Sequence, residues 1–361
     1  MATGCFRTFQ RKFSTVIFKE DLLEQAFSPR GLFRIFSSDF SRTDLADGYY
    51  DNEFFHGATF GDMRKVRPFI LINATDMIQG VRFEFSQDQF DLLCSDLSKL
   101  HVSRAVTAST SFPVVFAPMR LDNHAGECGY QPPEWLIRDY KERDMNTGLY
   151  DQSRMLMTYL DFQRRPTIKL VDGGISDASA LRGPLYALLR EDGLWSLQDK
   201  IKRGEIKKLL VIIVNARAEP AETSESVLSR IGLAQTVSRV TVSVLENYSS
   251  DTTERINDLF AQWKKAETAY AERRAYCERN ERDRAEHCVG EIYPEGPPPY
   301  PQTSLVHLRF DSLQDDSERQ FFNSIGTRLD LPRESVDRVR AAAKKLLDDS
   351  PQFQDFLHSL Q

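Results

Sequence analysis

The sequence predicts an α/β fold with a mainly parallel central sheet and a helical extension toward the C-terminus. Apolar runs at residues 68–73, 167–171 and 207–214 have the length of strands, and their continuous apolar character is typical of parallel strands buried on both faces. Segments with helical periodicity separate these runs. The pattern becomes mainly helical and charged after Glu219. We therefore expect an α/β domain over residues 1–218 and a helical extension over residues 219–361.

The first domain opens with helical sequence. Residues 5–40 have a helical pattern, and Ser28-Pro29 is typical of a helix start, with serine as the N-cap and proline at the first position. Another helix is expected to begin at Ser41, and four aromatic residues follow it. They are Tyr49, Tyr50, Phe54 and Phe55. Aromatic residues at this spacing form cores more often than lipid sites, so we assign them to the core.

The rest of the first domain alternates between strands and helices. We expect further strands at 81–85 and 114–121 and further helices at 102–109, 150–162 and 185–190. Residues 122–143 are rich in Asn, Gly, Pro and charge, which predicts a surface loop of the kind that often carries binding function.

The extension is dominated by one charged helical tract. Helices are expected over residues 224–248 and 251–286. In the second, an apolar stripe of Ile256, Leu259, Phe260, Trp263, Ala266 and Tyr270 lies among many charges. We interpret it as a long, largely solvated helix rather than a docking surface. A Pro-rich linker at 294–301, a strand at 305–310, an amphipathic helix at 332–347 and a short helix from Gln352 complete the chain.

Composition excludes several classes of protein. The 361 residues carry 47 basic and 53 acidic side chains without basic blocks, which argues against nucleic acid as a partner. No apolar run reaches the length of a membrane span, and the first residues show no signal peptide. The compartment and the oligomeric state stay open.

The cysteines and histidines indicate neither a metal site nor a cofactor. The five cysteines have no Cys-x-x-Cys spacing, and the six histidines form no pattern of a catalytic triad or metal site. Cys94 with Cys128, and Cys277 with Cys288, could each form a disulfide if the protein matures outside the cytoplasm, but free thiols explain the sequence equally well.

The most informative motif follows the strand at 167–171. Asp172 stands at the carboxyl end of this strand, where open α/β sheets place functional groups. Gly173 and Gly174 then allow a sharp turn with positive φ and a close approach of the backbone to a bound group. We therefore take Asp172 as the candidate catalytic residue.

The stretch Leu170-Val-Asp-Gly-Gly-Ile-Ser-Asp177 resembles the Asp-Gly-Gly motif that carries the catalytic aspartate of patatin-like phospholipases, in particular their bacterial branch. Similar stretches follow the same order at residues 67–76, 90–97, 105–118, 211–217 and 326–357, so the resemblance covers nearly the whole chain. It implies a patatin-like three-layer fold and a role in lipid degradation. In that mechanism a Ser–Asp dyad hydrolyses carboxylic esters of phospholipids or lysophospholipids at a membrane surface, and Asp172 accepts the proton of the serine.

The serine of the dyad has no counterpart in this sequence. The family places it on a Gly-x-Ser-x-Gly turn. The only two glycines spaced four apart are Gly57 and Gly61, with Thr59 between them, and we interpret Thr59 as a loop residue. Ser109 and Ser111 lack flanking glycines, so both are expected to be structural. Asp177, the next carboxylate after Asp172, is expected to order its loop.

The start of the chain resembles the helix that follows the nucleophile in the family. We therefore expect the chain to lack a βαβ unit, on the order of 30 residues or more, that holds the nucleophile and the oxyanion loop. Two hypotheses follow. The first is a lipid acyl hydrolase whose present chain is inactive because the serine is missing. The alternative is a non-catalytic remnant or a lipid-surface binding module.

Overall fold

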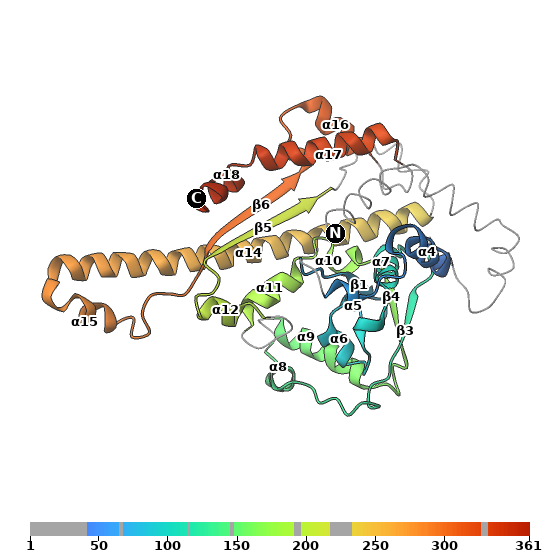
Figure 1. Cartoon of the computed structure of the whole chain (residues 1–361), viewed down its shortest axis with the longest axis horizontal. Coiled ribbons are helices and arrows are strands. Elements are labelled where there is room, and N and C mark those ends of the chain that lie inside the picture. Colours follow the sequence, from blue (N-terminus) through green and yellow to red (C-terminus); the bar gives the residue numbers. More distant parts are fainter. Residues whose placement is uncertain are drawn as a thin grey trace, which may run out of the picture. The chain divides into compact units, whose positions relative to one another are not determined.

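The computed structural model describes residues 42–64, 68–113, 116–144, 148–190, 196–216, 233–325 and 331–361, and shows a mixed α/β protein (Figure 1). Its chain divides into two compact units. Unit 1 comprises residues 1–180, 220–248 and 325–341, and unit 2 comprises residues 181–219, 249–324 and 342–361. The units interleave along the sequence, and the domain boundary expected at residue 218 stays a prediction. The helices expected within 5–40, and residues 224–232 of the helix expected over 224–248, lie outside the described residues.

The sheet of unit 1 has four strands in the order β2-β1-β4-β3. They are β1 (Asn73–Asp76), β2 (Val81–Glu84), β3 (Met119–Asp122) and β4 (Thr167–Val171). Every neighbouring pair is antiparallel, so the expected mainly parallel sheet was wrong. The short turn 77–80 joins β1 to β2, and a connection of this length permits only an antiparallel pair.

Strand β1 begins five residues later than predicted. Residues 68–72 are not strand, and the side chains of Phe69 and Ile70 are 70% and 49% exposed. The buried strand is instead the polar run 73–76. An apolar pattern misplaces such a strand because it buries polar side chains, of which Thr75 and Asp76 have hydrogen-bonding partners.

The helices of unit 1 confirm several predictions. They are α4 (Arg42–Tyr50), the π-helical turn η1 (Asp51–Phe55), α5 (Phe60–Met63), α6 (Gln87–Asp91), η2 (Leu97–Lys99), α7 (Val102–Thr110), α8 (Glu134–Glu142), α9 (Leu149–Met157), η3 (Thr158–Leu160) and α10 (Gly174–Asp177). Helices α4, α7 and α9 lie where the sequence predicted them. The region expected to be only a surface loop, 122–143, contains α8.

Aromatic side chains form much of the core of unit 1. Tyr49 and Tyr50 are buried with Phe54 and Phe55 packed against them, which confirms their assignment to the core. A second group surrounds Phe83, whose ring centroid lies 5.5–6.0 Å from those of Phe85, Phe90 and Tyr159. Such edge-to-face pairs stabilise a core beyond their area of burial.

Unit 2 is built on two parallel strands. They are β5 (Lys208–Asn215) and β6 (Gln302–Arg309), which pair along their whole length and confirm the strands predicted there. The unit's helices are α11 (Arg182–Leu189), α12 (Gln198–Lys202), η4 (Arg282–Arg284), α15 (Ala285–Gly290), η5 (Phe310–Ser312), α16 (Asp316–Ser324) and α18 (Pro351–Ser359). Helices α14 (Leu233–Asn280) and α17 (Arg333–Asp348) contribute residues to both units.

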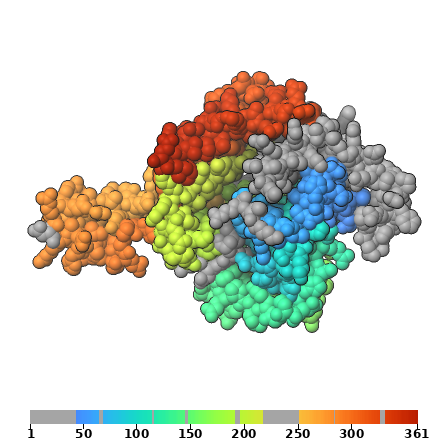
Figure 2. Space-filling view, viewed as in Figure 1, coloured from blue at the N-terminus to red at the C-terminus, as the bar shows by residue number. Residues whose placement is uncertain are grey.

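The apolar stripe of α14 belongs to the core of unit 2. Ile256, Phe260 and Trp263 are buried against residues of α11, α12 and β5, and the ring of Trp263 stacks on Tyr300 at 5.2 Å. The expectation of a largely solvated helix was therefore wrong for this part. Beyond Trp263 the helix is mostly exposed, and Figure 2 shows this end and α15 in orange.

Candidate functional site

Asp172 lies directly after β4, as predicted, and α10 begins two residues later. The glycines that follow do not adopt positive φ: Gly173 has φ −65° and Gly174 starts the helix, so that part of the prediction was wrong. Gly173 is required for another reason. A Cβ atom at this position would lie 2.4 Å from the carbonyl oxygen of Asn73. The motif therefore serves close packing of the turn against β1.

The end of α7 holds the turn through its backbone. The N–H of Asp172 donates to the carbonyl of Ser111 at 2.9 Å, and the N–H of Gly173 donates to that of Ser109 at 3.1 Å. The hydroxyl of Ser111 donates back to the carbonyl of Thr107 at 2.6 Å. Both serines that resemble nucleophile candidates thus support the turn with their carbonyls.

A pair of hydroxyls fastens the turn from the side of β1. Thr75 Oγ1 donates to the carbonyl of Asp172 at 2.7 Å and lies 2.8 Å from Ser176 Oγ. Because a hydroxyl has one proton, the Ser176 hydroxyl donates to Thr75. Sequence reasoning missed both residues, since a short polar strand carries no signal for such a contact.

The carboxylate of Asp172 is only partly engaged. Its Oδ1 accepts a hydrogen bond from the N–H of Gly174 at 2.8 Å. Among the residues that the structure describes, Oδ2 has no hydrogen-bond partner. Burial raises the pKa of Asp172, and the Gly174 N–H partly offsets that rise. A half-buried carboxylate with one oxygen fixed and one available has the form required of a general base.

Asp177 anchors the helix that follows. Its side chain is buried, and Oδ2 lies 3.9 Å from Nε of Arg82 on β2. Arg82 also pairs with the buried Glu84. The backbone N–H of Asp177 donates to the carbonyl of Gly173 at 3.2 Å. These contacts fit the expected role of Asp177 in ordering the segment after Asp172.

Asp76 ends β1, and the sequence suggested that this end lies near the active face. The register of the antiparallel β1–β4 pair places Asp76 beside Leu170, two residues before Asp172. Its Oδ2 accepts from the hydroxyl of Tyr159 at 2.9 Å and pairs with Arg165. Its Oδ1 accepts from the N–H groups of Ile78 at 3.0 Å and Gln79 at 3.3 Å. This fully bonded carboxylate is structural.

Thr59, between the two spaced glycines, caps a helix. It is the N-cap of α5 and shares a capping box with Asp62, whose Oδ2 accepts from its hydroxyl at 2.9 Å and from its N–H at 3.1 Å. The Thr-x-x-Asp spacing is a readable signal for this role. Nothing in this arrangement frees the hydroxyl for nucleophilic attack.

Other features of the described chain bear on function. None of its helices is long and apolar enough to cross a membrane. Within the same residues, no three His, Cys, Asp or Glu side chains come together as metal ligands would. Comparison of the chain with protein-family models, curated proteins and solved structures found no match.

Proposed function

We propose that this protein is a lipid acyl hydrolase of the patatin-like type and that Asp172 is its catalytic base. The observation that carries the proposal is the half-buried carboxylate of Asp172, with Oδ1 fixed by Gly174 and Oδ2 without a partner among the described residues. The resemblance of residues 170–177 to the family's Asp-Gly-Gly motif supports the same role. The patatin-like three-layer arrangement belongs to the proposal, beyond the mixed α/β architecture.

In the proposed reaction, Asp172 Oδ2 accepts the proton of a serine hydroxyl while the serine oxygen attacks the ester carbonyl of a lipid. The protonated Asp172 then gives the proton to the leaving alcohol, and an acyl-enzyme remains. Water, deprotonated by Asp172, hydrolyses the acyl-enzyme and regenerates the serine. Fixing of Oδ1 by Gly174 keeps the carboxylate oriented through both steps.

A non-catalytic lipid-surface module is the second candidate. One observation favours it: the 361 residues contain no Gly-x-Ser-x-Gly turn. Because the two members of a catalytic dyad depend on each other, a chain without the serine loses almost all activity by this mechanism. The two candidates differ in whether the protein made by its own cells hydrolyses esters.

The test is ester hydrolysis by the protein captured from cells that make it, with an antibody raised against the 361-residue chain. Substrates are p-nitrophenyl butyrate and phosphatidylcholine vesicles containing lysophosphatidylcholine. Captured protein is expected to hydrolyse them, and Asp172→Asn in the same cells is expected to lower kcat/KM by about 100-fold or more. Asp122→Asn, at the exposed end of β3, is the matched control and is expected to change little. Equal rates for all three proteins would contradict the proposal.

The purified 361-residue chain gives the complementary measurement. We expect it to be folded by circular dichroism and inactive on the same esters. Sedimentation with the vesicles, in the absence of hydrolysis by the captured protein, would support the binding module. Hydrolysis by the purified chain that is lost in Asp172→Asn would instead locate the nucleophile within these 361 residues.

A further inference from the structure

The far end of α14 and the segment after it form a hairpin with almost no core. Between Trp263 and Pro301, Cys277 and Cys288 are the only buried residues that the structure describes. Their sulfur atoms are bonded to each other. Around them, Tyr276 is 48% and Ile292 56% exposed, and seven of the ten residues between the two cysteines are charged.

The remaining contacts of this hairpin are few and polar or aromatic. Arg273 Nη2 donates to the carbonyl of Cys288 at 3.0 Å, and the rings of Tyr270 and Tyr293 meet edge to face at 5.1 Å. Small elements that cannot bury enough apolar surface are held by disulfides or metals. The described hairpin has the former, so its order depends on the cysteine pair being oxidised.

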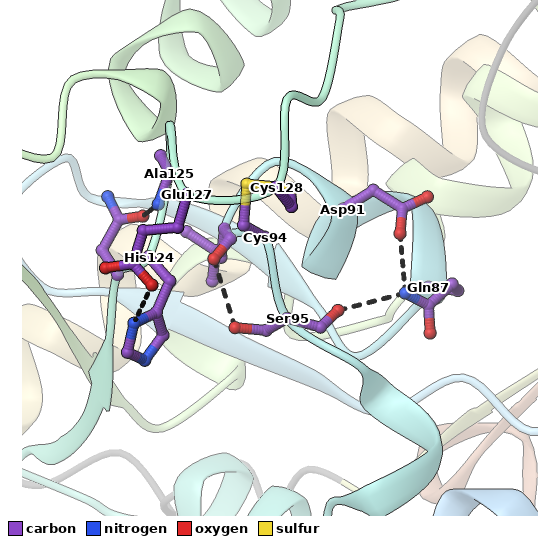
Figure 3. The surroundings of a disulfide bond; sticks show 10 residues. Gln87, Asp91, Cys94, Ser95, His124, Ala125, Glu127 and Cys128 are labelled. Carbon is purple, nitrogen blue, oxygen red and sulfur yellow. Dashed lines mark hydrogen bonds and ion pairs between the residues drawn. A yellow bond between two sulfur atoms is a disulfide. The ribbon is translucent and has the colours of Figure 1, made fainter.

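A second pair, Cys94 and Cys128, joins two segments of unit 1 (Figure 3). Cys94 has φ 49°, in the left-handed region, where helix ends usually place glycine or asparagine. It follows α6, and the N–H of Ser95 closes the helix end on the carbonyl of Phe90 at 3.0 Å. A cysteine at this unfavourable position indicates that its side chain is needed there.

Cys128 lies on an exposed loop that owes its path to glycine. Gly126 and Gly129, on either side of it, have φ 90° and 68°. Apart from the disulfide, the N–H of His124 reaches the carbonyl of Leu93 at 3.1 Å, and the His124 and Glu127 side chains pair within the loop (Figure 3). The loop carries little buried apolar surface, so the disulfide is its main attachment to α6.

We propose that both disulfides are present in the mature protein and that the chain matures in an oxidising compartment outside the cytoplasm. Each bond forms when two thiols lose two protons and two electrons to the disulfide of a thiol oxidant, which becomes a dithiol. Because Cys128 is exposed, the thiol pool of the cytoplasm would reach and reduce its bond. Taken with the proposed function, on which this last step rests, the bonds place the lipid substrate on the oxidising side of a membrane.

Thiol counting on protein from its own cells tests the proposal. Cells are separated into cytoplasmic and extracytoplasmic fractions, and each fraction is quenched in acid. The protein is then denatured and alkylated with N-ethylmaleimide, and its molecular mass is measured before and after reduction. We expect the protein in the extracytoplasmic fraction, with reduction releasing four thiols out of the five cysteines. Release of two thiols or none, or recovery of the protein in the cytoplasm, would overturn it.

Peptide mapping without reduction identifies the partners. Peptides holding Cys94 and Cys128 are expected to be linked, and so are those holding Cys277 and Cys288; any other linkage would overturn the assignment. Under mild reductant, the exposed Cys94–Cys128 bond is expected to open before the buried Cys277–Cys288 bond. The thiol count does not depend on ester hydrolysis, so failure of this proposal and failure of the proposed function are separate results.

Discussion

Asp76 ends strand β1, Asp172 directly follows the neighbouring strand β4, and the two carboxylates have opposite surroundings. Asp76 is fully buried, and its two oxygens receive two backbone N–H groups, the Tyr159 hydroxyl and Arg165. Asp172 is half-buried, and its carboxylate receives one N–H group from Gly174. The guanidinium of Arg165 also lies over the ring of Tyr159, 4.8 Å from its centroid, so the two side chains that bond Asp76 also contact each other.

This difference supports the proposal that Asp172 acts as a base, whereas Asp76 is structural. The acceptor positions of the Asp76 carboxylate are filled by these four donors, which gives it a structural role. The burial of Tyr159 and the charge of Asp76 raise the pKa of the Tyr159 hydroxyl, which keeps it a donor. Asp172 keeps an oxygen for exchange of a proton, which is what base catalysis requires.

The largest effect on stability is expected from Asp76→Asn. This change leaves Arg165 without its buried counterion, and breaking such a pair costs about 3–5 kcal/mol. The free energy of unfolding from urea titration measures the loss. A change below about 1 kcal/mol would show that solvent screens the Asp76–Arg165 pair and would contradict its burial.

Gly173→Ala is expected to have the second-largest effect on the free energy of unfolding. Its methyl group would overlap the carbonyl of Asn73, and forcing an extra carbon into a packed site costs about 1–3 kcal/mol. Gly48→Ala is the matched control, because nothing lies within 4 Å of the added carbon in helix α4. It is expected to stabilise by about 0.5–1 kcal/mol. Equal effects of the two changes in urea unfolding would contradict the close approach at Gly173.

Thr75→Val removes the hydroxyl that bonds the Asp172 carbonyl and accepts from Ser176. Loss of one partner from a buried hydrogen-bonded pair costs about 1–3 kcal/mol. Ser176→Ala is expected to cost less stability in the Thr75→Val variant than in the natural chain, because the Thr75 hydroxyl that Ser176 bonds is already absent. Additive effects in this double-mutant cycle would show that the two hydroxyls act independently.

Asp172→Asn is expected to have the smallest effect, within about 1 kcal/mol. Asparagine keeps the acceptor for the Gly174 N–H. Because folding raises the pKa of Asp172, the protonated form favours folding below the unfolded pKa, and this contribution is lost as pH rises through the folded pKa. The asparagine variant should therefore gain stability relative to the natural chain as pH rises over that range. If the asparagine variant instead lost stability relative to the natural chain, folding would lower the pKa of Asp172 rather than raise it.

Part of this picture was readable from the sequence. The strand at 167–171 and the helix at 102–109 were predicted because their apolar patterns match their burial. The strand at 207–214 was predicted from its apolar run, although of its residues only Ile213 is buried. The antiparallel sheet was missed because apolar runs do not reveal strand direction. Strand β1 was misplaced because it buries polar side chains, which an apolar pattern does not mark as buried.

For the candidate site, the sequence pointed to the residue with a local motif and missed the residues with distant contacts. Asp172 was identified from its motif, which is local in sequence. Thr75, Tyr159 and Arg165 gain their roles from contacts across 83–97 residues of chain, and no local pattern reports these. The contacts of Asp177 fit the predicted role in local order, but its partner Arg82 was not found for the same reason.

The measurement that tests the central claim most directly is the pKa of the Asp172 carboxyl group, followed by ¹³C NMR on aspartate-labelled chain and assigned by the signal lost in Asp172→Asn. Desolvation with a single N–H partner predicts a pKa above the ordinary value of about 3.9. A pKa at or below that value would mean that the carboxylate is well solvated or fully bonded. Asp172 would then be a structural residue like Asp76, and the proposed base would have to be another group.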